Sequence, residues 1–225
     1  MQISPDDTEP KSGRRVAGQD PAKRNQILDG AKRCFLDVGF DAASMNEVTA
    51  AAGVSKGTLY VYFEDKVGIL SALIEREKLA ALSAAANALN AGGTTREALT
   101  RFGTHVTTRL TSDEVIKAQR MVLGVAERFP EIAQRFFASD TFSAHMTLKD
   151  YLDARPQEFD IDDTDLAARQ FLELAMASIY KRRLFGNLAT PASPEQIARV
   201  VGSAVDIFLS YYGRKPPSRS AAPSP

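Results

Sequence analysis

The sequence has little cysteine, no excess charge of either sign and no long apolar run. Its single cysteine, Cys34, cannot form an internal disulfide, which fits the reducing cytoplasm. Basic and acidic residues number 28 each, so the overall charge gives no sign of a nucleic-acid partner. No apolar stretch approaches the roughly 20 residues that span a bilayer, and the polar N-terminus does not resemble a signal peptide. We therefore expect a cytoplasmic protein that does not enter membranes.

The sequence also lacks any stretch in which apolar and polar residues alternate with a period of two, so it predicts no strands. Apolar residues recur instead at helical spacing, and we expect an all-α fold. A compact three-helix unit is expected at residues 20–66 and a helical-bundle domain at 67–213. The polar ends, 1–19 and 214–225, are predicted to be disordered. The helices are expected at about 21–38, 44–52, 55–63, 65–89, 95–110, 113–128, 131–154, 164–185 and 194–212.

Basic residues are concentrated near the N-terminus, although the whole chain is neutral. Residues 11–35 contain seven lysines and arginines but only two aspartates. A local excess of this kind favours contact with the phosphates of DNA. Arg14 and Arg15 could form an arm that reaches a DNA groove, or they could belong to an ordinary solvated tail.

The most informative stretch runs from Ala52 to Phe63. Gly53 can adopt the left-handed conformation that ends a helix, and the Ser55 hydroxyl can cap the next helix. Leu59 and Phe63, four residues apart, give that helix one buried face. A helix this short is marginal by itself, so neighbouring helices must hold it while its other face stays outward. That outward face comprises Lys56, Gly57, Thr58, Tyr60, Val61 and Tyr62.

We interpret this stretch as the turn and second helix of a helix-turn-helix, with the outward face directed at DNA. Tyr60 has an alternative role in core packing where the two helices meet. Two capped helices precede the stretch: Asp20-Pro21 opens the first, which Gly39 ends, and Ser44 with Glu47 forms a capping box on the second. The buried stripe of the first helix is expected to contain Ile27, Ala31, Cys34, Phe35 and Val38.

Enzymatic and metal-binding patterns are weak in this sequence. Residues 53–57 match G-x-S-x-G, the nucleophile elbow of serine hydrolases, but that elbow requires a preceding strand, and a helix is predicted here. His105 and His145 lie on different predicted helices without neighbouring carboxylates or thiols, whereas a zinc site needs three or four ligands. We therefore expect no catalytic residues, no metal and no cofactor.

The region from about Arg24 to Leu70 resembles the DNA-binding domain of the TetR family of transcriptional repressors. The residues that carry the resemblance are Phe35, Gly39, Phe40, Ser44, Val48, the stretch 52–60, Tyr62, Phe63 and Lys66. The resemblance implies a homodimer that places two copies of the second helix in successive major grooves of an operator. It also implies that the DNA contacts are Ser44, Met45, Asn46, Ser55, Lys56, Gly57, Thr58, Tyr60, Val61, Tyr62 and Lys66, with Lys66 at a phosphate.

Such a regulator needs a dimer seam and a sensor in its C-terminal domain. The helices expected at 164–185 and 194–212 have an apolar arc wider than burial on one side requires. A four-helix seam with a second copy explains this arc, and a fully internal C-terminal helix in a monomer is the alternative. The predicted seam residues are Ala168, Leu172, Ala175, Val201, Ala204 and Phe208.

The helices between residues 95 and 154 hold more large apolar side chains than one packed layer needs. We therefore predict a pocket for a small, largely apolar effector between them. Its residues are expected to be Phe102, His105, Val106, Arg120, Met121, Phe136, Met146, Phe171 and Ile179, with Phe137, Glu127, His145 and Tyr151 as further candidates. The long helix at 65–89 is expected to be the only rigid connection between sensor and DNA-binding unit.

These features together predict a ligand-responsive transcriptional repressor that binds a palindromic operator as a dimer and leaves it when an effector binds. The alternative is an α-helical small-molecule-binding protein or adaptor without repressor activity.

Overall fold

The computed structural model describes residues 20–214, without the side chains of residue 135 and residues 137–143. Its elements are α1 (Pro21–Val38), α2 (Met45–Ala52), α3 (Lys56–Tyr62), α4 (Lys66–Asn90), α5 (Thr95–Leu110), α6 (Asp113–Val125), α7 (Pro130–Asp153), α8 (Thr164–Ala175), α9 (Tyr180–Leu184) and α10 (Pro194–Tyr212). Within the described range there is no strand, only an isolated bridge between Phe159 and Gly213. The all-α prediction is confirmed. The predicted arm with Arg14 and Arg15, and residues 215–225, lie outside the described residues.

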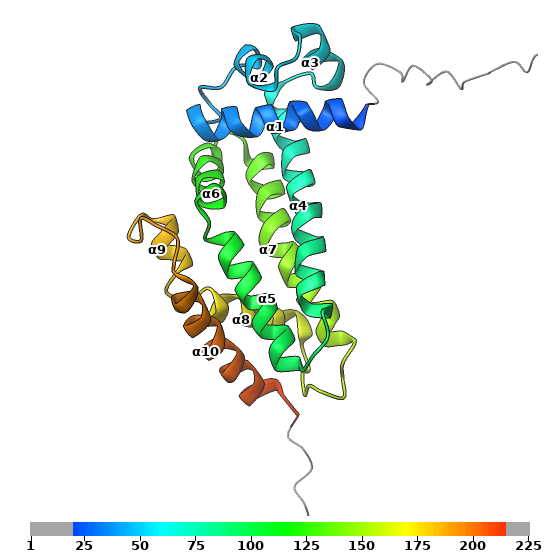
Figure 1. Cartoon of the computed structure of the whole chain (residues 1–225), viewed down its shortest axis with the longest axis vertical. Helices are drawn as coiled ribbons and strands as arrows, with labels where there is room; N and C mark the ends of the chain where they lie inside the picture. Colours follow the sequence, from blue (N-terminus) through cyan, green and yellow to red (C-terminus); the bar gives the residue numbers. More distant parts are fainter. Residues whose placement is uncertain (1–19, 215–225) are drawn as a thin grey trace, which may run out of the picture.

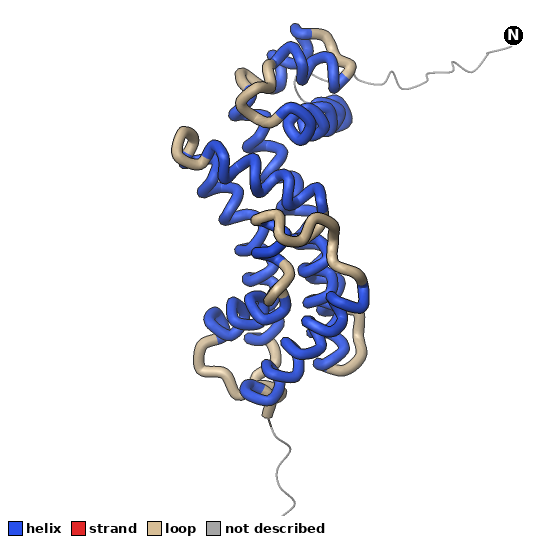
Figure 2. Tube along the Cα trace, turned by 90° about the vertical axis from the view of Figure 1, so that its left-hand side faces the viewer, coloured by secondary structure: helices blue, strands red, loops and turns tan. Residues whose placement is uncertain are grey.

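The helices form an elongated molecule (Figures 1 and 2). Helices α1–α3 lie at one end, and α4 runs from them to the other end with α7 beside it (Figure 1). Helices α5, α8 and α10 pack together in the half farthest from α1–α3. Among residues 20–214, no helix combines the length and apolar character required to cross a membrane.

Local capping signals set most helix boundaries as the sequence predicted. The Asp20 carboxylate accepts a hydrogen bond from the Ala22 amide at the start of α1, and Gly39 with φ 83° ends that helix. Ser44 and Glu47 form the predicted capping box on α2. Further capping boxes open α5 and α10. These side chains satisfy amide groups that have no partner within their own helix, which fixes where each helix begins.

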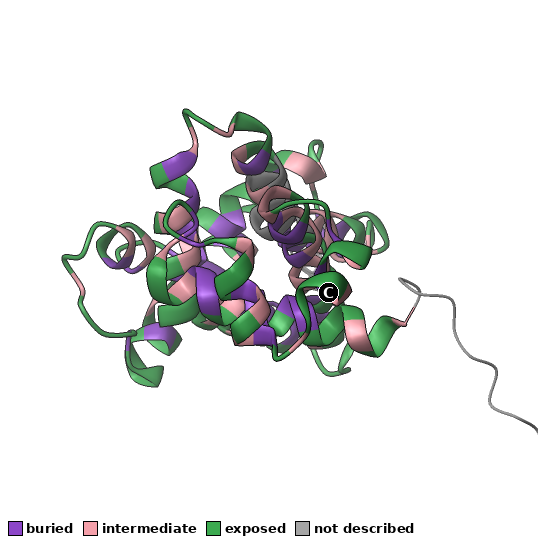
Figure 3. Ribbon diagram, turned by 90° about the horizontal axis from the view of Figure 1, so that it is seen from above, coloured by how far each residue is buried: buried purple, intermediate pink, exposed green. Residues whose placement is uncertain are grey.

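The buried side chains form two clusters. Figure 3 colours the buried positions purple along the helices. The distal cluster joins α5, α8 and α10 to the ends of α4 and α7, around Phe102, Phe171 and Phe208. The proximal cluster fills the three-helix unit, but it also contains Val122 and Val125 of α6 and Ile132 of α7. The DNA-binding unit predicted at 20–66 therefore shares its core with the sensor helices.

This shared core corrects the expectation that the long helix alone joins the two parts. The Phe40 ring, just after α1, packs edge-on against Phe129 between α6 and α7, with centroids 5.6 Å apart. Arg128 also pairs with Asp41 across the same contact. A movement in the sensor can thus reach α1–α3 through the α6–α7 corner as well as through α4.

The predicted helix 164–185 is wrong as a single element. It is divided into α8 and α9 by a turn in which Ser178 has φ 63°, an uncommon value for a residue with a Cβ. Thr107 of α5 donates to the Ala175 carbonyl at the end of α8 (3.0 Å). After the turn, buried Arg183 donates to the Thr111 carbonyl (3.0 Å) and pairs with Asp113 (2.5 Å). These contacts with other helices outweigh the local preference for a continuous helix.

Val38, which was predicted to lie in the buried stripe of the first helix, is exposed because it is the last residue of α1. Leu123 also lies on the outer side of its helix, α6, while its neighbour Val122 faces the core. Periodicity shows that a helix has an apolar side, but the edge of that side depends on where the neighbouring helix ends.

Candidate DNA-binding interface and effector site

The α2–turn–α3 segment has helix-turn-helix geometry. Gly53, with φ 63° and ψ 40°, ends α2 in the left-handed conformation, and the Ser55 hydroxyl accepts from the Thr58 amide at the start of α3 (3.1 Å). A helix precedes the serine, so the nucleophile-elbow interpretation of residues 53–57 has no strand to support it. In the described range, histidine, cysteine and acidic side chains form no group of three able to hold a metal ion.

Side chains of α1 hold the end of α2, a contact that the sequence did not reveal. The Gln26 amide donates to the Ala52 carbonyl (2.8 Å), and Arg33 donates to the Ala51 carbonyl (2.7 Å). These carbonyls belong to the last turn of α2 and have no partner within their helix. Between the two contacts, Gly30 allows the helices to approach so closely that a Cβ there would lie 2.3 Å from the Ala52 Cα. An isolated glycine inside a helical pattern was the available signal for this close packing.

Helix α3 presents one face to the core and the other outward. Leu59 and Phe63 are buried in the proximal cluster, as predicted. Tyr60 and Val61 are 46% and 52% exposed, so the alternative of core packing for Tyr60 does not hold. Lys56 and Gly57 are also exposed, on the first turn. The outward surface of α3 is thus a cation, a glycine and two large side chains on a rigid support.

The other predicted DNA contacts are placed less uniformly. Asn46 is exposed at the start of α2, whereas Met45 and Tyr62 are half-buried against the proximal cluster. Thr58 is half-buried, and its hydroxyl lies 2.8 Å from that of Ser55. Ser44 and Ser55 both serve as helix caps. Helix N-termini favour anions, so these two remain suited to phosphate through their helix ends.

Lys66 contacts the protein's own backbone, whereas a contact with a DNA phosphate was expected. Its ammonium group donates to the carbonyls of Phe40 (2.8 Å), Asp41 (2.9 Å) and Ala43 (3.0 Å). It also lies 4.8 Å from the centroid of the Phe40 ring. All three of its N–H donors are therefore used inside the protein. Lys66 fastens the loop between α1 and α2 onto the start of α4.

We therefore expect replacement of Lys66 by methionine to lower stability more than it changes DNA electrostatics. Three carbonyls would lose a charged donor, at a cost of about 1–3 kcal/mol in the free energy of unfolding. Urea denaturation measures this loss. The slope of log affinity for DNA against log salt concentration should stay close to that of the wild type. If the slope fell by about one per subunit and the stability stayed unchanged, the result would support the original prediction that Lys66 contacts a phosphate.

The predicted effector residues do not form a single pocket. Phe102, Phe171 and Ile179 are packed in the distal cluster, where the first two rings lie 6.1 Å apart. Arg120 donates to the carbonyls of Arg183 (2.7 Å) and Leu184 (2.9 Å), which holds α9 against α6. Packing or backbone contacts occupy these four residues, and none of them lines the two cavities described below.

The further candidates are also scattered. His145 is buried with its Nε2 atom 2.8 Å from an Asp165 oxygen, and Glu127 is exposed. Tyr151 is buried in the distal cluster. Met146 is half-buried and lines neither of the two cavities that the other candidates line. The side chain of Phe137 lies outside the described residues.

The remaining four predicted residues line two cavities. The junction cavity lies between α1, α4, α6 and α7, and its apolar lining includes Phe35, Leu73, Ala118, Met121, Val122 and Phe136. The inner cavity lies between α4, α5 and α7, and is lined by Ala81, Ala85, His105, Val106, Arg109 and Ala144. Met121 and Phe136 thus belong to the first, and His105 and Val106 to the second.

The predicted dimer seam lies on the inward face of its two helices, although Ala204 also lines a groove on their outer side. Its six residues, Ala168, Leu172, Ala175, Val201, Ala204 and Phe208, all belong to the distal cluster of the chain itself, and none is more than 2% exposed. The opposite faces of α8 and α10 carry Leu166, Ile207 and Tyr211, of which the last two are 51% and 78% exposed. A shallow groove between these faces is lined by Leu174, Ala177 and Val200.

Comparison with known proteins agrees with this architecture. Residues 27–73 match the family model of bacterial regulatory proteins of the tetR family, and residues 97–214 match the C-terminal domain of AefR-like transcriptional repressors. A putative TetR-family regulator from Mesorhizobium loti has the same fold, with a TM-score of 0.79 at 19% identity over 86% of this chain and 98% of that one. The flavonoid-responsive regulator FrrA has a TM-score of 0.70 at 26% identity, covering 88% of this chain and 100% of its own.

Curated relatives match only around the helix-turn-helix. The repressor Rv1474c of Mycobacterium tuberculosis is 41% identical over 64 residues, which cover 28% of this chain and 34% of the relative. The activator FasR of Mycolicibacterium smegmatis is 38% identical over 69 residues, 30% of this chain and 32% of the relative. The alignments thus span about a third of these relatives. With one model matching α1–α4 and a second spanning more than half of the sequence, the chain belongs to the TetR family of transcriptional regulators.

Proposed function

We propose that this protein is a ligand-responsive transcriptional repressor that binds a palindromic operator as a homodimer. The observation that carries the proposal is the outward face of α3, where exposed Lys56, Gly57, Tyr60 and Val61 project from a helix held by Leu59 and Phe63. An α-helix fits the major groove, where base edges are distinguishable. Its site of action would then be the cytoplasm.

Each exposed residue of α3 suits a specific part of DNA. The Lys56 ammonium can donate to guanine or neutralise a phosphate, and Gly57 beside it allows the backbone to come close to the duplex. The Tyr60 hydroxyl suits a phosphate oxygen. Val61 offers an apolar surface of the kind that contacts the thymine methyl group. Asn46 and the amide ends of α2 and α3 add positioning contacts at the flanking backbone.

A homodimer would join through the outer faces of α8 and α10. These faces expose Leu166, Ile207 and Tyr211 beside the shallow groove of Leu174 and Val200. Apolar side chains that gather on one face of a protein mark an interaction surface. A two-fold axis there would place the two α3 helices at one edge of the dimer. They would then reach half-sites about 34 Å apart.

We expect Ile207→Glu to give a folded monomer with weak operator binding. A charge at the centre of the seam would lose hydration without gaining a partner, which costs several kcal/mol in association free energy. Sedimentation measures the monomer, and circular dichroism shows that the fold is kept. The comparison variant is Val201→Glu, on the inward face of the same helix. It should unfold the distal cluster because Val201 is fully buried there. A dimeric Ile207→Glu protein would show that the seam lies elsewhere.

Selection of DNA from a random pool with the full-length protein tests the operator proposal. The expected product is an inverted repeat whose half-sites are one helical turn apart, bound by two copies of the chain. Footprinting of the recovered sequence should place both half-sites in major grooves. Recovery of no enriched sequence would favour the alternative of a small-molecule-binding protein or adaptor without repressor activity.

The effector is proposed to be small and largely apolar. FrrA, which is similar over its whole length, is named for its response to flavonoids. Here the junction and inner cavities are mostly lined by apolar side chains. Binding would favour a conformation that fits DNA poorly, and a preference of about 100-fold between conformations shifts the equilibrium by about 2.7 kcal/mol.

A further inference from the structure

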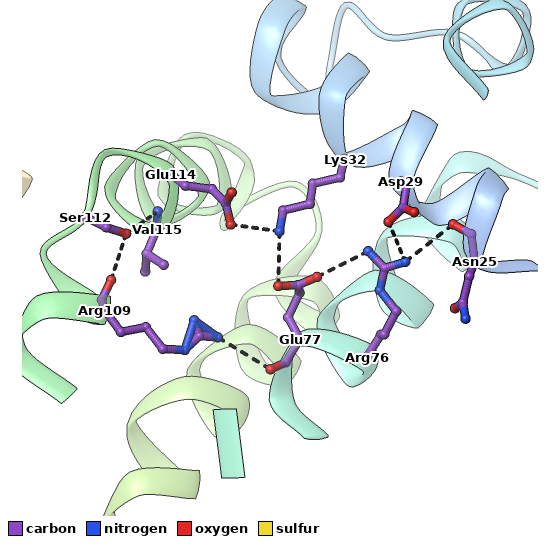
Figure 4. A network of polar contacts seen from close by, with 9 residues as sticks. All are labelled: Asn25, Asp29, Lys32, Arg76, Glu77, Arg109, Ser112, Glu114 and Val115. Carbon is purple, nitrogen blue, oxygen red and sulfur yellow. Dashed lines mark hydrogen bonds and ion pairs between the residues drawn. The ribbon is translucent and has the colours of Figure 1, made fainter. Parts of the chain in front are cut away.

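The junction cavity and the inner cavity meet at one side chain. Arg109 of α5 is a lining residue of both, the apolar space under α1 and the smaller space deeper in the sensor. It also donates to the Glu77 carbonyl of α4 (3.4 Å), as Figure 4 shows. His105 lies one turn earlier on α5, about 6 Å along the helix axis. The two spaces therefore share one lining residue and adjoin the same stretch of α5.

The Lys32, Glu77 and Glu114 charges beside the junction cavity are already paired with one another (Figure 4). Lys32 of α1 lies 3.1 Å from Glu77 of α4 and 2.7 Å from Glu114 of α6. Arg76 lies 2.8 Å from Asp29 and 3.2 Å from Glu77. Although partial burial opposes its charge, Lys32 has a raised pKa because it bonds to both glutamates. A charged ligand would have to break these pairs, so the site selects an uncharged one.

His105, which lines the inner cavity, carries a polar atom that no described residue satisfies. The Nε2 atom of His105 is buried and has no hydrogen-bond partner among the described residues. Burial lowers the pKa of His105, and the nearby Arg109 cation lowers it further, so the ring is neutral near pH 7. A neutral imidazole nitrogen pairs with a hydroxyl group as either donor or acceptor. Leaving it unpaired costs free energy that a suitable ligand recovers.

We propose that the two cavities form one ligand site for an uncharged aromatic molecule that carries a hydroxyl group. The rings lie in the junction cavity between Phe35, Met121 and Phe136, and the hydroxyl passes Arg109 to reach His105. The ligand's role as an effector rests on the proposed function, but its binding does not.

The size of the site explains how an occupant would act on α1–α3. The free volumes are about 60 Å³ and 20 Å³, whereas an engineered apolar cavity that binds benzene has about 150 Å³. A ring system therefore has to push the walls apart. The Lys32–Glu114 pair is the weak point, because Glu114 is 55% exposed and water screens the attraction. Opening there moves α1, which carries α2 through Gln26 and Arg33.

Calorimetry with 2-naphthol, naphthalene and 2-naphthoate, on the full-length protein without DNA, tests the site. We expect 2-naphthol to bind, naphthalene to bind about tenfold more weakly, and 2-naphthoate not to bind up to about 1 mM. The substitution Ala118→Phe fills the junction cavity and should weaken the binding of 2-naphthol at least about tenfold. The control Leu123→Phe lies on the exposed side of the same helix and should bind as the wild type does.

Two further variants test the hydrogen bond and the opening. His105→Phe should weaken the binding of 2-naphthol about tenfold and leave the binding of naphthalene nearly unchanged. His105→Gln should restore part of the lost affinity for 2-naphthol. Glu114→Gln weakens the contact with Lys32 and should tighten the binding of 2-naphthol about threefold, since α1 and α6 then separate more easily. A purely structural role for His105 would weaken both ligands alike.

The site is overturned if 2-naphthol does not bind the wild type up to about 1 mM, if Ala118→Phe binds it normally, or if 2-naphthoate binds better. The proposed function fails separately. If 2-naphthol binds with the expected variant pattern but leaves affinity for the selected DNA unchanged, the ligand site stands and its role as an effector does not.

Discussion

Replacement of Lys56 by alanine is expected to weaken operator binding by about two to four orders of magnitude. Lys56 is exposed on the first turn of α3, beside Gly57, where its ammonium group can reach the duplex. A specific contact of this kind contributes about 1–3 kcal/mol. A dimer loses it twice. Fluorescence anisotropy with the selected operator measures the change.

The salt dependence of the same titration separates base contact from phosphate contact. A dimer that touches about 6–10 phosphates should lose about 10³–10⁵ in affinity between about 50 and 200 mM salt. If Lys56 contacts guanine, Lys56→Ala narrows the gap between operator and random DNA. If it contacts phosphate, it lowers the salt slope and weakens all sequences alike. The control Lys117→Ala removes the same charge from an exposed position on α6. Equal losses in both variants would mean a general charge effect and no role for α3.

The parts of the fold that the sequence predicts well are those set by near neighbours. Gly53 ends α2 and Ser55 opens α3 because each acts on amides or carbonyls within a few residues. The choice between an exposed and a packed Tyr60 was decided by the structure, whereas the buried face of α3 with Leu59 follows from helical spacing. For this reason the outward face of α3 can be identified from the order of its residues.

The parts that could not be predicted depend on which distant element covers a given face. Val201 and Ile207 are both apolar residues of α10, yet the first is covered by the chain's own distal cluster and the second is exposed. The spacing of apolar residues cannot distinguish a helix face that packs inside the chain from one that packs against a second copy of it. Similarly, the Lys66 ammonium group donates to three backbone carbonyls, and not to the expected phosphate, because the loop at 40–43 lies next to it.

The residues that line the cavities were predicted only in part for the same reason. Phe102 and Phe171 are large and apolar, but they fill the distal cluster and leave no space between them. The larger of the two cavities lies between helices of the DNA-binding unit and the sensor, and α1 forms one of its walls. A composition-based argument assigns a pocket to the sensor alone. It cannot place one at a junction whose geometry is set by long-range packing.

Gly30→Ala is expected to destabilise the DNA-binding unit and abolish operator binding. Alanine inside a helix normally gains about 1 kcal/mol over glycine. Here the added Cβ would lie 2.3 Å from the Ala52 Cα and 2.5 Å from the Ala52 amide nitrogen, and a backbone cannot yield as a flexible side chain can. Forcing α1 and α2 apart costs about 1–3 kcal/mol or more and also strains the Gln26 and Arg33 contacts. The clash therefore outweighs the gain in helix propensity.

Thermal unfolding and anisotropy should together show the effect. The 2.3 Å overlap should lower the midpoint of unfolding by several degrees, and the displaced α2 should carry α3 out of register with the groove. Gly202→Ala is the matched control, since a Cβ there meets nothing within 4 Å in the middle of α10, and it should leave stability the same or slightly higher. If Gly30→Ala were as stable as Gly202→Ala and still bound operator, α1 and α2 could not be packed as closely as described, and the Gln26 clamp on α2 would lose its basis.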